Sequence, residues 1–386
     1  MIYRKFQDMR LSMLGMGNMR LPTTAERGPI DENKARAIID RAFAGGVNYF
    51  DTAYRYHNGE SESFIGRALA DFPRESWYLA SKMPGHMMNY ENGKLGFQGY
   101  LAGHRASSAA DIFEEQLEKC RVDYFDFYLL HNLCETSYDL YTDEQLGMVD
   151  YLLSQKKAGR IRHLGFSAHG RAETIDRFLS RFDCFEFVQI QLNYLDWALQ
   201  GAGKKVEVIA KHGLPVIAME PVRGGRLAKL SPDAEARLSE IAPGRSVASW
   251  AFRYLQALPQ VAVALSGMTT LEQLEDNLAT YEALDPLTVP EQAVLNEIVK
   301  GMTDMVPCTA CRYCVEECPQ NLDIPKLISM YNEMKYEKSF TLRFTLDAMS
   351  EAEKPAACIA CGACARICPQ GIAIPDVMDK FAALLG

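Results

Sequence analysis

Residues 161–192 read IRHLGFSAHGRAETIDRFLSRFDCFEFVQIQL. An apolar run at 161–166 is followed by an amphipathic stretch at 171–181 and by a second apolar run at 187–192. Strand, helix and strand in this order, with short connections, are typical of two parallel strands joined by a crossover helix. The segment therefore predicts a parallel sheet that is covered by helices.

The same alternation continues in both directions along the chain. Eight apolar runs of strand length occur at 14–17, 47–50, 77–81, 126–130, 161–166, 187–192, 215–219 and 261–265. Eight helical stretches fall between and after them, near 32–44, 61–71, 107–121, 143–158, 171–181, 201–212, 245–257 and 271–284. Eight strands that alternate with eight helices over about 270 residues predict a (β/α)8 barrel. Residues 1–13 are expected to form a β-hairpin that plugs the floor of this barrel.

A doubly wound parallel sheet is the alternative with the same alternation. That fold often has a glycine-rich phosphate-binding turn after its first strand. The sequence at this place, Gly15-Met-Gly-Asn-Met-Arg20, lacks the third glycine and does not lead directly into a helix. We therefore favour the barrel.

The overall composition is that of an ordinary folded protein. Of 386 residues, 48% are hydrophobic and 24% are charged, which disfavours wholesale disorder and is compatible with two or three domains. A formal charge of −9 argues against a nucleic-acid-binding surface, because such surfaces are basic. No membrane-length apolar stretch occurs, and the N-terminal MIYRKFQDMR lacks the apolar core of a signal peptide. We expect a cytoplasmic protein without a membrane span or a nucleic-acid partner.

Eight of the 11 cysteines are concentrated after residue 300. They form two runs of the pattern CxxCxxCxxxCP, with Cys308, Cys311, Cys314 and Cys318 in the first and Cys358, Cys361, Cys364 and Cys368 in the second. This is the spacing of bacterial ferredoxins with two [4Fe–4S] clusters, in which the fourth cysteine of each run ligates the other cluster. The expected ligand sets are Cys308, Cys311, Cys314 and Cys368 for one cluster, and Cys358, Cys361, Cys364 and Cys318 for the other. Zinc binding and plain buried thiols are the alternatives, which two complete copies of the pattern disfavour.

The cysteine runs belong to a separate C-terminal module. Thr288-Val-Pro-Glu291 is a helix start, and the 39 residues between the runs look largely helical. We therefore expect a barrel domain at 1–290 and a mostly helical dicluster domain at 291–386. The eighth barrel helix should return the chain to the barrel floor, so whether the module reaches the opposite end of the barrel stays open.

Several polar residues terminate or interrupt the predicted strands. They are Asp51, Lys82, His131, Ser167, Gln189 and Glu220. In a (β/α)8 barrel the chemistry lies at the carboxyl ends of the strands. A lone polar residue at a strand end is usually just solvated, but a lysine, an acid and a histidine near a tyrosine have a joint chemical use.

The tyrosine is Tyr56, which follows the second predicted strand. A tyrosine with its ordinary pKa near 10 is a poor proton donor or acceptor at neutral pH. A nearby ammonium favours the phenolate and lowers that pKa. Lys82 can supply the ammonium, Asp51 can keep it charged and in place, and His131 can hydrogen-bond the reacting oxygen.

These residues stand in recognisable motifs. FDTA at 50–53 with Tyr56, the Ser81-Lys82 strand end and YLLH at 128–131 resemble the aldo-keto reductase family, and LGFS at 164–167 matches less closely. The resemblance covers about residues 1–300. It implies a barrel that binds an extended nicotinamide dinucleotide, NAD(H) or NADP(H), and interconverts a small-molecule carbonyl and alcohol. It also implies that Tyr56 is the general acid–base, tuned by Lys82 and Asp51, and that His131 orients the carbonyl.

The resemblance further implies the residues that contact the cofactor. Ser167 and Gln189 would hold the carboxamide, and Asp276 and Asn277 the adenine; the remaining cofactor positions are Gly17, Asn18, Met219, Gly267 and Gln273. Gly267 and Gln273 stand where relatives that prefer NADPH have cations, and neither can pair with a phosphate charge. NADH is therefore favoured, although Arg223 or Arg226 could reach the nucleotide from the loop that contains Gly224 and Gly225.

The loop at 83–106 is long for this fold and contains five glycines and three methionines. Long loops at this end of a barrel are usually functional, which favours a substrate lid or a docking surface for the tail. A tolerated surface insertion is the alternative.

The two halves of the chain use different electron chemistry. A nicotinamide passes two electrons as a hydride, whereas a [4Fe–4S] cluster passes one at a time, and no flavin motif lies between them. We expect an enzyme whose clusters transfer electrons, with a flavoprotein or a ferredoxin as a candidate redox partner. The alternatives are an electron-transfer subunit with the barrel as a docking scaffold, and clusters that are structural or redox-sensing.

Overall fold

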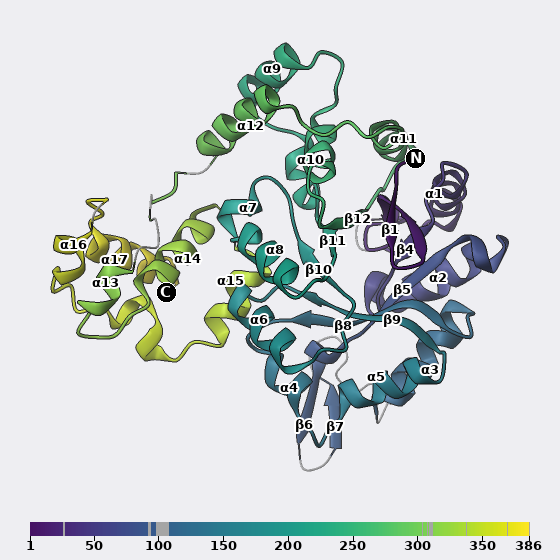
Figure 1. Cartoon of the computed structure of the whole chain (residues 1–386), viewed down its shortest axis with the longest axis horizontal. Helices are drawn as coiled ribbons and strands as arrows, with labels where there is room; N and C mark the ends of the chain where they lie inside the picture. The colour runs from purple at the N-terminus through teal and green to yellow at the C-terminus, as the bar shows by residue number, and fades with distance from the viewer. Residues whose placement is uncertain are drawn as a thin grey trace.

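The computed structural model describes residues 1–25, 28–91, 94–97, 108–302, 304–306, 308, 312–336, 338–368 and 370–385. Eight parallel strands form a closed barrel (Figure 1). In chain order they are β3 (Leu14–Gly17), β4 (Tyr49–Asp51), β5 (Tyr78–Met83), β8 (Phe125–Leu133), β9 (Ile161–Ala168), β10 (Phe187–Gln191), β11 (Val216–Met219) and β12 (Val261–Ser266). β12 pairs with β3 and closes the sheet, which confirms the predicted (β/α)8 barrel.

One helix follows each barrel strand and covers the outside of the sheet. These helices are α1 (Glu32–Ala44), α2 (Glu60–Leu69), α3 (Ala109–Cys120), α5 (Met148–Lys157), α6 (Ala172–Arg181), α8 (Ala202–Lys211), α10 (Val247–Gln256) and α11 (Leu271–Thr280). The helix expected from residue 143 begins only at Met148, because Gly147 has a φ of 51° and interrupts the helical backbone. Three further helices were not expected: α4 (Tyr138–Thr142), α7 (Asp196–Leu199) and α9 (Pro232–Ile241).

Helix α1 illustrates why these segments form where they do. The Asp31 carboxylate accepts a hydrogen bond from the backbone N–H of Lys34 at 3.2 Å and caps the first turn. Its buried residues, Ala35, Ile38, Ile39 and Ala42, recur at intervals of three and four. One apolar stripe therefore faces the barrel while the charged residues remain outside.

The N-terminal residues close the floor of the barrel. β1 (Tyr3–Phe6) and β2 (Met9–Ser12) pair in antiparallel fashion and form the expected hairpin. The ring centroid of Phe6 lies 5.2 Å from that of Phe127 and 6.1 Å from that of Phe187, near the amino ends of β8 and β10. The predicted plug is thereby confirmed.

The long loop after β5 begins with an element that we did not expect. β6 (Met88–Glu91) and β7 (Lys94–Phe97) form a second antiparallel hairpin. Residues 92–93 and 98–107 lie outside the described residues. The interpretation of this loop as a lid or docking surface therefore stays a prediction.

Helix α12 (Val289–Met302) follows the barrel. Thr288 caps it, with its hydroxyl accepting from the Glu291 N–H at 3.4 Å and the Glu291 carboxylate accepting from the Thr288 N–H at 2.7 Å. Leu295 and Ile298 are buried in the barrel core, and α12 packs against α9. We therefore propose that the domain boundary lies after α12 rather than at residue 290.

The C-terminal domain is mostly helical, as expected from the sequence. Its helices are α13 (Tyr313–Glu316), α14 (Ile324–Tyr336), α15 (Phe340–Asp347), α16 (Ala363–Ile367) and α17 (Ile374–Leu385). It has its own core, in which Leu327 and Met330 of α14 pack with Met378 and Phe381 of α17. In the parts of the chain that the structure describes, no helix has the length and apolar character needed to cross a membrane.

Candidate active site and cluster site

A buried lysine is the centre of the candidate active site. Lys82, which is fully buried in β5, donates from Nζ to Oδ1 of Asp51 at 2.6 Å, to the carbonyl oxygen of Thr52 at 2.7 Å and to the phenol oxygen of Tyr56 at 3.4 Å. The structure thus brings together three of the four residues predicted to carry the chemistry. A lysine in this environment keeps its charge because an anion and two oxygen acceptors surround it.

The backbone after β4 places Tyr56 beside this lysine. Tyr56 begins a short 3₁₀ turn in which His57 and Asn58 have φ values of 51° and 56°. Gly59, with a φ of 93°, then starts α2. A left-handed conformation is uncommon for non-glycine residues, and such backbone strain is found mostly at functional sites.

The proton of the Tyr56 phenol is held more tightly than the sequence suggested. Burial raises the pKa of Tyr56, and although the Lys82 ammonium lowers it, the ammonium does not outweigh burial. Lys82 thus acts in the predicted direction, but burial leaves the pKa of Tyr56 above its ordinary value. Burial by itself would lower the pKa of Lys82, but Asp51 and Tyr56 together raise it, so the ammonium and the neutral phenol are the resting forms.

His131 completes the predicted set. Its ring centroid lies 6.1 Å from that of Tyr56, with the two ring planes 82° apart. Its carbonyl oxygen accepts a hydrogen bond from the Tyr141 hydroxyl at 2.5 Å. Glu220, at the end of β11, has a φ of 53°, and its carboxylate also raises the pKa of Tyr56. The four residues and Glu220 therefore surround one end of the barrel.

A second group of polar residues lies beside the first and fits a carboxamide. The Ser167 hydroxyl accepts from the backbone N–H of Asn132 at 2.9 Å, and Gln189 Nε2 lies 3.6 Å from the sulfur of Met219. Oε1 of Gln189 and Oδ1 of Asn132 are buried, and neither has a hydrogen-bond partner among the described residues. Buried acceptors of this kind suit the amide of a nicotinamide. Asn132 was not expected from the sequence, although it directly follows His131.

The first strand contributes the next part of the candidate cofactor site. Gly17 is paired with Asp51 in the register of β3 and β4. The buried side chain of Asn18 donates from Nδ2 to the carbonyl oxygen of Asp51 at 2.9 Å. These two residues therefore lie next to Asp51.

The residues expected at the adenine end have partners within the chain. Gln273 forms a capping box with Thr270 at the start of α11. Asn277 is buried and donates to the Ser266 hydroxyl at 3.0 Å, and Asp276 accepts from the Ser246 hydroxyl at 2.7 Å. These bonds hold α11 against the barrel, so a direct role of the three side chains in cofactor binding stays a prediction.

The structure changes the interpretation of two arginines. Arg223 is buried, forms an ion pair with Asp196 and lies with its guanidinium carbon 4.9 Å from the ring centroid of Tyr336, so its charge is already paired within the chain. Arg20 was not considered, yet it is exposed and lies beside two glycine positions. A Cβ added at Gly267 would lie 3.0 Å from Cβ of Arg20, and one added at Gly224 would lie 3.3 Å from Nη2. Its position directly after the first strand was the available sequence signal.

A buried carboxyl group is linked to Lys82 through a hydrogen-bond network. Glu62, at the start of α2, is fully buried and accepts from the Ser81 hydroxyl and from Nε2 of Gln116, both at 2.6 Å. Gln116 Nε2 also donates to the carbonyl oxygen of Lys82 at 3.1 Å. Burial raises the pKa of Glu62 to about 7. This network fixes the end of β5, and no chemical motif in the sequence pointed to it.

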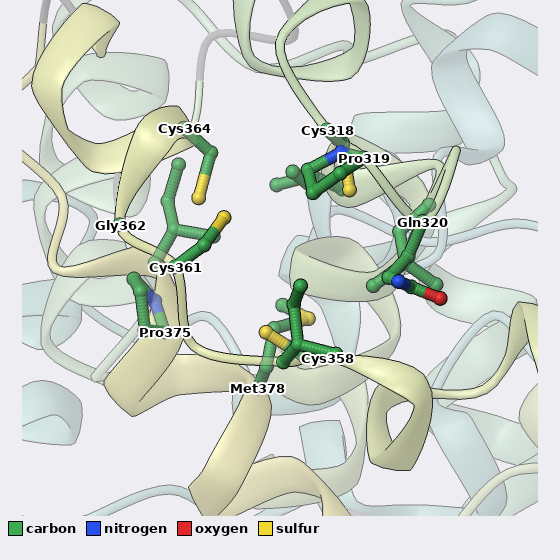
Figure 2. Close-up of a pocket in the computed structure, with 13 residues that line it drawn as sticks. Cys318, Pro319, Gln320, Cys358, Cys361, Gly362, Cys364, Pro375 and Met378 are labelled. Atoms are coloured by element: carbon green, nitrogen blue, oxygen red, sulfur yellow. The ribbon is translucent and has the colours of Figure 1, made fainter.

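The cysteine pocket lies in the C-terminal domain. Cys318, Cys358, Cys361 and Cys364 line one pocket, together with apolar residues such as Ile374 and Met378. Figure 2 shows sulfur atoms around this common space, one from the first cysteine run and the others from the second. Four thiols in a largely apolar setting fit the ligand requirement of a [4Fe–4S] cluster. No three His, Cys, Asp or Glu side chains in the described ranges converge closely enough to hold a single metal ion.

The second ligand set is only partly described. Cys314 belongs to the core of the same domain, and Cys308 and Cys368 pack against that core. Cys311 lies outside the described residues. Helices α13 and α16, which carry cysteines of the two runs, pack against each other. The arrangement is consistent with cross-ligation between the runs, which stays a prediction for this set.

Comparison with known proteins agrees with this geometry. The model of the aldo/keto reductase family matches residues 13–300, and that of a 4Fe-4S dicluster domain matches residues 307–373. An uncharacterized oxidoreductase of Bacillus subtilis is 25% identical over 297 residues, 72% of this chain and 89% of the relative. An NADH-specific methylglyoxal reductase of Escherichia coli is 25% identical over 305 residues, 70% of this chain and 90% of the relative.

A solved structure extends the likeness to three dimensions. The holo form of an aldo-keto reductase from Bacillus halodurans has a TM-score of 0.60 and 27% sequence identity, and covers 77% of this chain and 95% of its own. The chain therefore belongs to the aldo/keto reductase family, as an oxidoreductase barrel that is followed in the same polypeptide by a 4Fe-4S dicluster domain.

Proposed function

We propose that the protein interconverts a small-molecule carbonyl and alcohol with NADH, and that Tyr56 is the general acid–base. The observation that carries this proposal is the buried Lys82, whose Nζ lies 2.6 Å from Asp51 and 3.4 Å from Tyr56. An ammonium at hydrogen-bond distance from a phenol stabilises the phenolate that forms when the phenol gives up its proton.

The direction of proton movement follows from the resting protonation states. In carbonyl reduction, Tyr56 donates its proton to the carbonyl oxygen as negative charge develops there, and Lys82 stabilises the resulting phenolate. Asp51 keeps Lys82 charged in a buried place, and His131 orients the carbonyl. When bound, NADH would supply the hydride for reduction of the carbonyl carbon, and NAD would accept it in the reverse direction. Ser167, Asn132 and Gln189 hold the carboxamide.

The preference for NADH rests on the start of α11. Gln273 is engaged in capping this helix, and the carboxylate of Glu272 lies in its first turn. The pKa of Glu272 is lowered by its own backbone N–H and by the Thr270 hydroxyl, so this carboxylate is ionised at neutral pH. A 2′-phosphate at this helix would face a negative charge, whereas a ribose hydroxyl would find an acceptor. The NADH specificity of the Escherichia coli relative points in the same direction.

We further propose two [4Fe–4S] clusters that exchange electrons with an external carrier, a flavoprotein or a ferredoxin. One cluster would be held by Cys318, Cys358, Cys361 and Cys364, and the pocket that these four line supports the set. The other would be held by Cys308, Cys311, Cys314 and Cys368.

Replacement of Tyr56 by phenylalanine tests the proposed chemistry. Tyr56→Phe should lower kcat with NADH and a panel of aldehydes about 10²- to 10⁴-fold, because the proton donor is lost. Tyr54→Phe is the matched control, since Tyr54 is buried two residues away and donates to Glu115 at 2.6 Å instead of facing Lys82. Unchanged turnover in Tyr56→Phe, measured by NADH absorbance, would overturn the role of this residue.

A further inference from the structure

The C-terminal domain contacts the barrel at the end where the candidate active site lies. Helix α14 packs against α7, which follows β10, and Tyr336 at the end of α14 covers the guanidinium of Arg223 in the loop after β11. The ring of Phe340 in α15 lies 5.6 Å from that of His169, which directly follows β9. Figure 1 shows α14 and α15 on this side of the barrel. The helical domain therefore meets the loops after three neighbouring strands, and it does so at the carboxyl ends of those strands.

This contact is polar and buried. Arg171, the residue before α6, donates from Nη2 to Glu333 of α14 at 3.1 Å and from Nε to the Thr345 hydroxyl of α15 at 3.2 Å. Glu333 and Thr345 are almost fully buried. Thr341, also buried, lies 3.4 Å from the side-chain oxygen of Gln200. Buried polar contacts tolerate little displacement, because a shifted partner leaves a desolvated group unpaired.

A second cation is buried beside this pair. Lys205 of α8 is 1% exposed, and no hydrogen-bond acceptor among the described residues reaches its Nζ. The charged groups around it are Arg171, Glu333, Glu135 and Asp196. The junction thus joins cations and carboxylates from both domains, which gives it one preferred arrangement rather than a sliding apolar contact.

The barrel side of the junction is connected to the proposed carboxamide site. Arg171 lies four residues after Ser167, and the N–H groups of His169 and Gly170 both donate to the carbonyl oxygen of Leu133. The Arg171 N–H donates to Glu135 at 2.8 Å. The segment from Ser167 to Arg171 is therefore bound to the end of β8, which contains Asn132, and to Glu135 just after that strand. The C-terminal domain holds these two segments at their outer end.

We infer that Arg171 and Glu333 are positioning residues, through which the cluster-bearing domain fixes the loops that hold the nicotinamide. The domain accordingly has a second task besides carrying clusters, because it sets the affinity of the barrel for its cofactor. This inference rests on the proposed NADH-dependent function and deepens it. Neither residue touches the reacting atoms, so the effect of each is on binding rather than on proton transfer.

The test measures cofactor binding separately from turnover in the full-length holoprotein. Glu333→Gln keeps the size of the side chain and removes its charge. We expect the Kd for NADH, from titration of nicotinamide fluorescence, to rise about tenfold, with kcat at saturating NADH changed less than about threefold. Visible absorbance of the clusters checks that the C-terminal domain remains folded. Thr345→Val removes the bond from Nε of Arg171 and the bond that the Thr345 hydroxyl donates to the carbonyl oxygen of Thr341. It should raise the Kd about threefold and serves if Glu333→Gln does not fold.

Glu144→Gln is the matched control. It removes an ion pair with Arg181 at the opposite end of α6, and this pair is exposed. The Kd should stay at the wild-type value. Wild-type protein that binds neither NADH nor NADPH would overturn the proposed function itself. Wild-type binding with unaltered affinity in both Glu333→Gln and Thr345→Val, or a parallel fall of affinity and kcat, would overturn only the positioning role.

Discussion

The active site of the barrel and the cysteine pocket are built in opposite ways. In the barrel, each important side chain is held by another: Lys82 binds Asp51, and Ser81 binds Glu62. In the C-terminal domain, Cys318, Cys358, Cys361 and Cys364 surround a pocket whose other walls are mostly apolar. The side chains of the first site bind one another, whereas the four thiols of the second line a shared pocket. The difference teaches that the barrel can be organised before it binds anything, but the cluster domain depends on what it binds.

The sizes of the two cores strengthen this contrast. The barrel buries an extended network of apolar residues around and inside its sheet. The core of the C-terminal domain is small and includes two of the cysteines themselves, Cys314 and Cys364. Small domains bury a lower fraction of their surface and usually need metals or other cross-links.

Removal of one cluster ligand should have the largest effect. Cys358→Ser is expected to cost the C-terminal domain about 5 kcal/mol or more, enough to unfold it, because small domains have little stability to lose. Calorimetry should then show the barrel transition alone, and visible absorbance should fall. Cys184→Ser, in a half-buried barrel cysteine, is the control and should leave both signals intact. A C-terminal transition that survives loss of the absorbance would break the contrast between the two sites.

The junction between the two regions gives the next effect. Burial lowers the pKa of Lys205 from its ordinary 10.5 to about 8. Below pH 8 the lysine is charged in both the folded and the unfolded chain, and the full cost of burying that charge is present. Between pH 8 and 10.5 the folded chain alone releases the proton, so stability rises with pH. Lys205→Met should therefore stabilise the protein by about 3 kcal/mol at pH 7, and by progressively less toward pH 10.5.

Denaturant unfolding at pH 7 and pH 10 measures this difference directly. Lys211→Met, in an exposed lysine of the same helix, is the matched control and should change stability little at either pH. A loss of stability in Lys205→Met at pH 7 would mean that the charged lysine contributes more by attraction than it costs by burial.

The smallest effect is expected at the rim of the barrel. Glu272→Lys replaces the carboxylate in the first turn of α11 by a cation. The ratio of kcat/KM for NADPH to that for NADH should rise about tenfold, or about 1.4 kcal/mol, because a 2′-phosphate then meets an opposite charge. Glu282→Lys makes the same charge change just beyond the other end of this helix and should leave the ratio unaltered. An equal response of both variants would place the ribose elsewhere.

The barrel could be predicted from the sequence because its information is local. Each strand and helix shows a characteristic spacing of apolar residues over a few positions. The bounds of β3 and α1 therefore agree with the expected ranges. The candidate residues Asp51, Lys82 and His131 were selected for the same reason, since they stand near the carboxyl ends of the predicted strands. The net rise in the pKa of Tyr56 was not foreseen, because burial depends on residues distant in the chain.

The contacts between distant segments could not be predicted. Arg171 and Glu333 are 162 positions apart, and nothing in either neighbourhood indicates the other. The hairpin of β6 and β7 after β5 and the helix α9 after β11 were not expected from the sequence. Arg223 was considered for nucleotide binding from its place in the sequence, but in the fold it forms an ion pair with Asp196. Such pairings are decided by tertiary packing, which overrides local pattern.

The hairpin that plugs the barrel floor has a kinetic consequence. Phe6 packs among the inner aromatic rings at the amino ends of the strands and closes this end of the barrel. Ligands therefore enter and leave at the carboxyl ends of the strands. Under the proposed function, a dinucleotide bound along the strand ends would lie in the path of a substrate that reaches Tyr56. The cofactor would therefore bind before the substrate and leave after the product, in an ordered sequence through the same opening. The cluster-bearing domain lies beside this open end of the barrel.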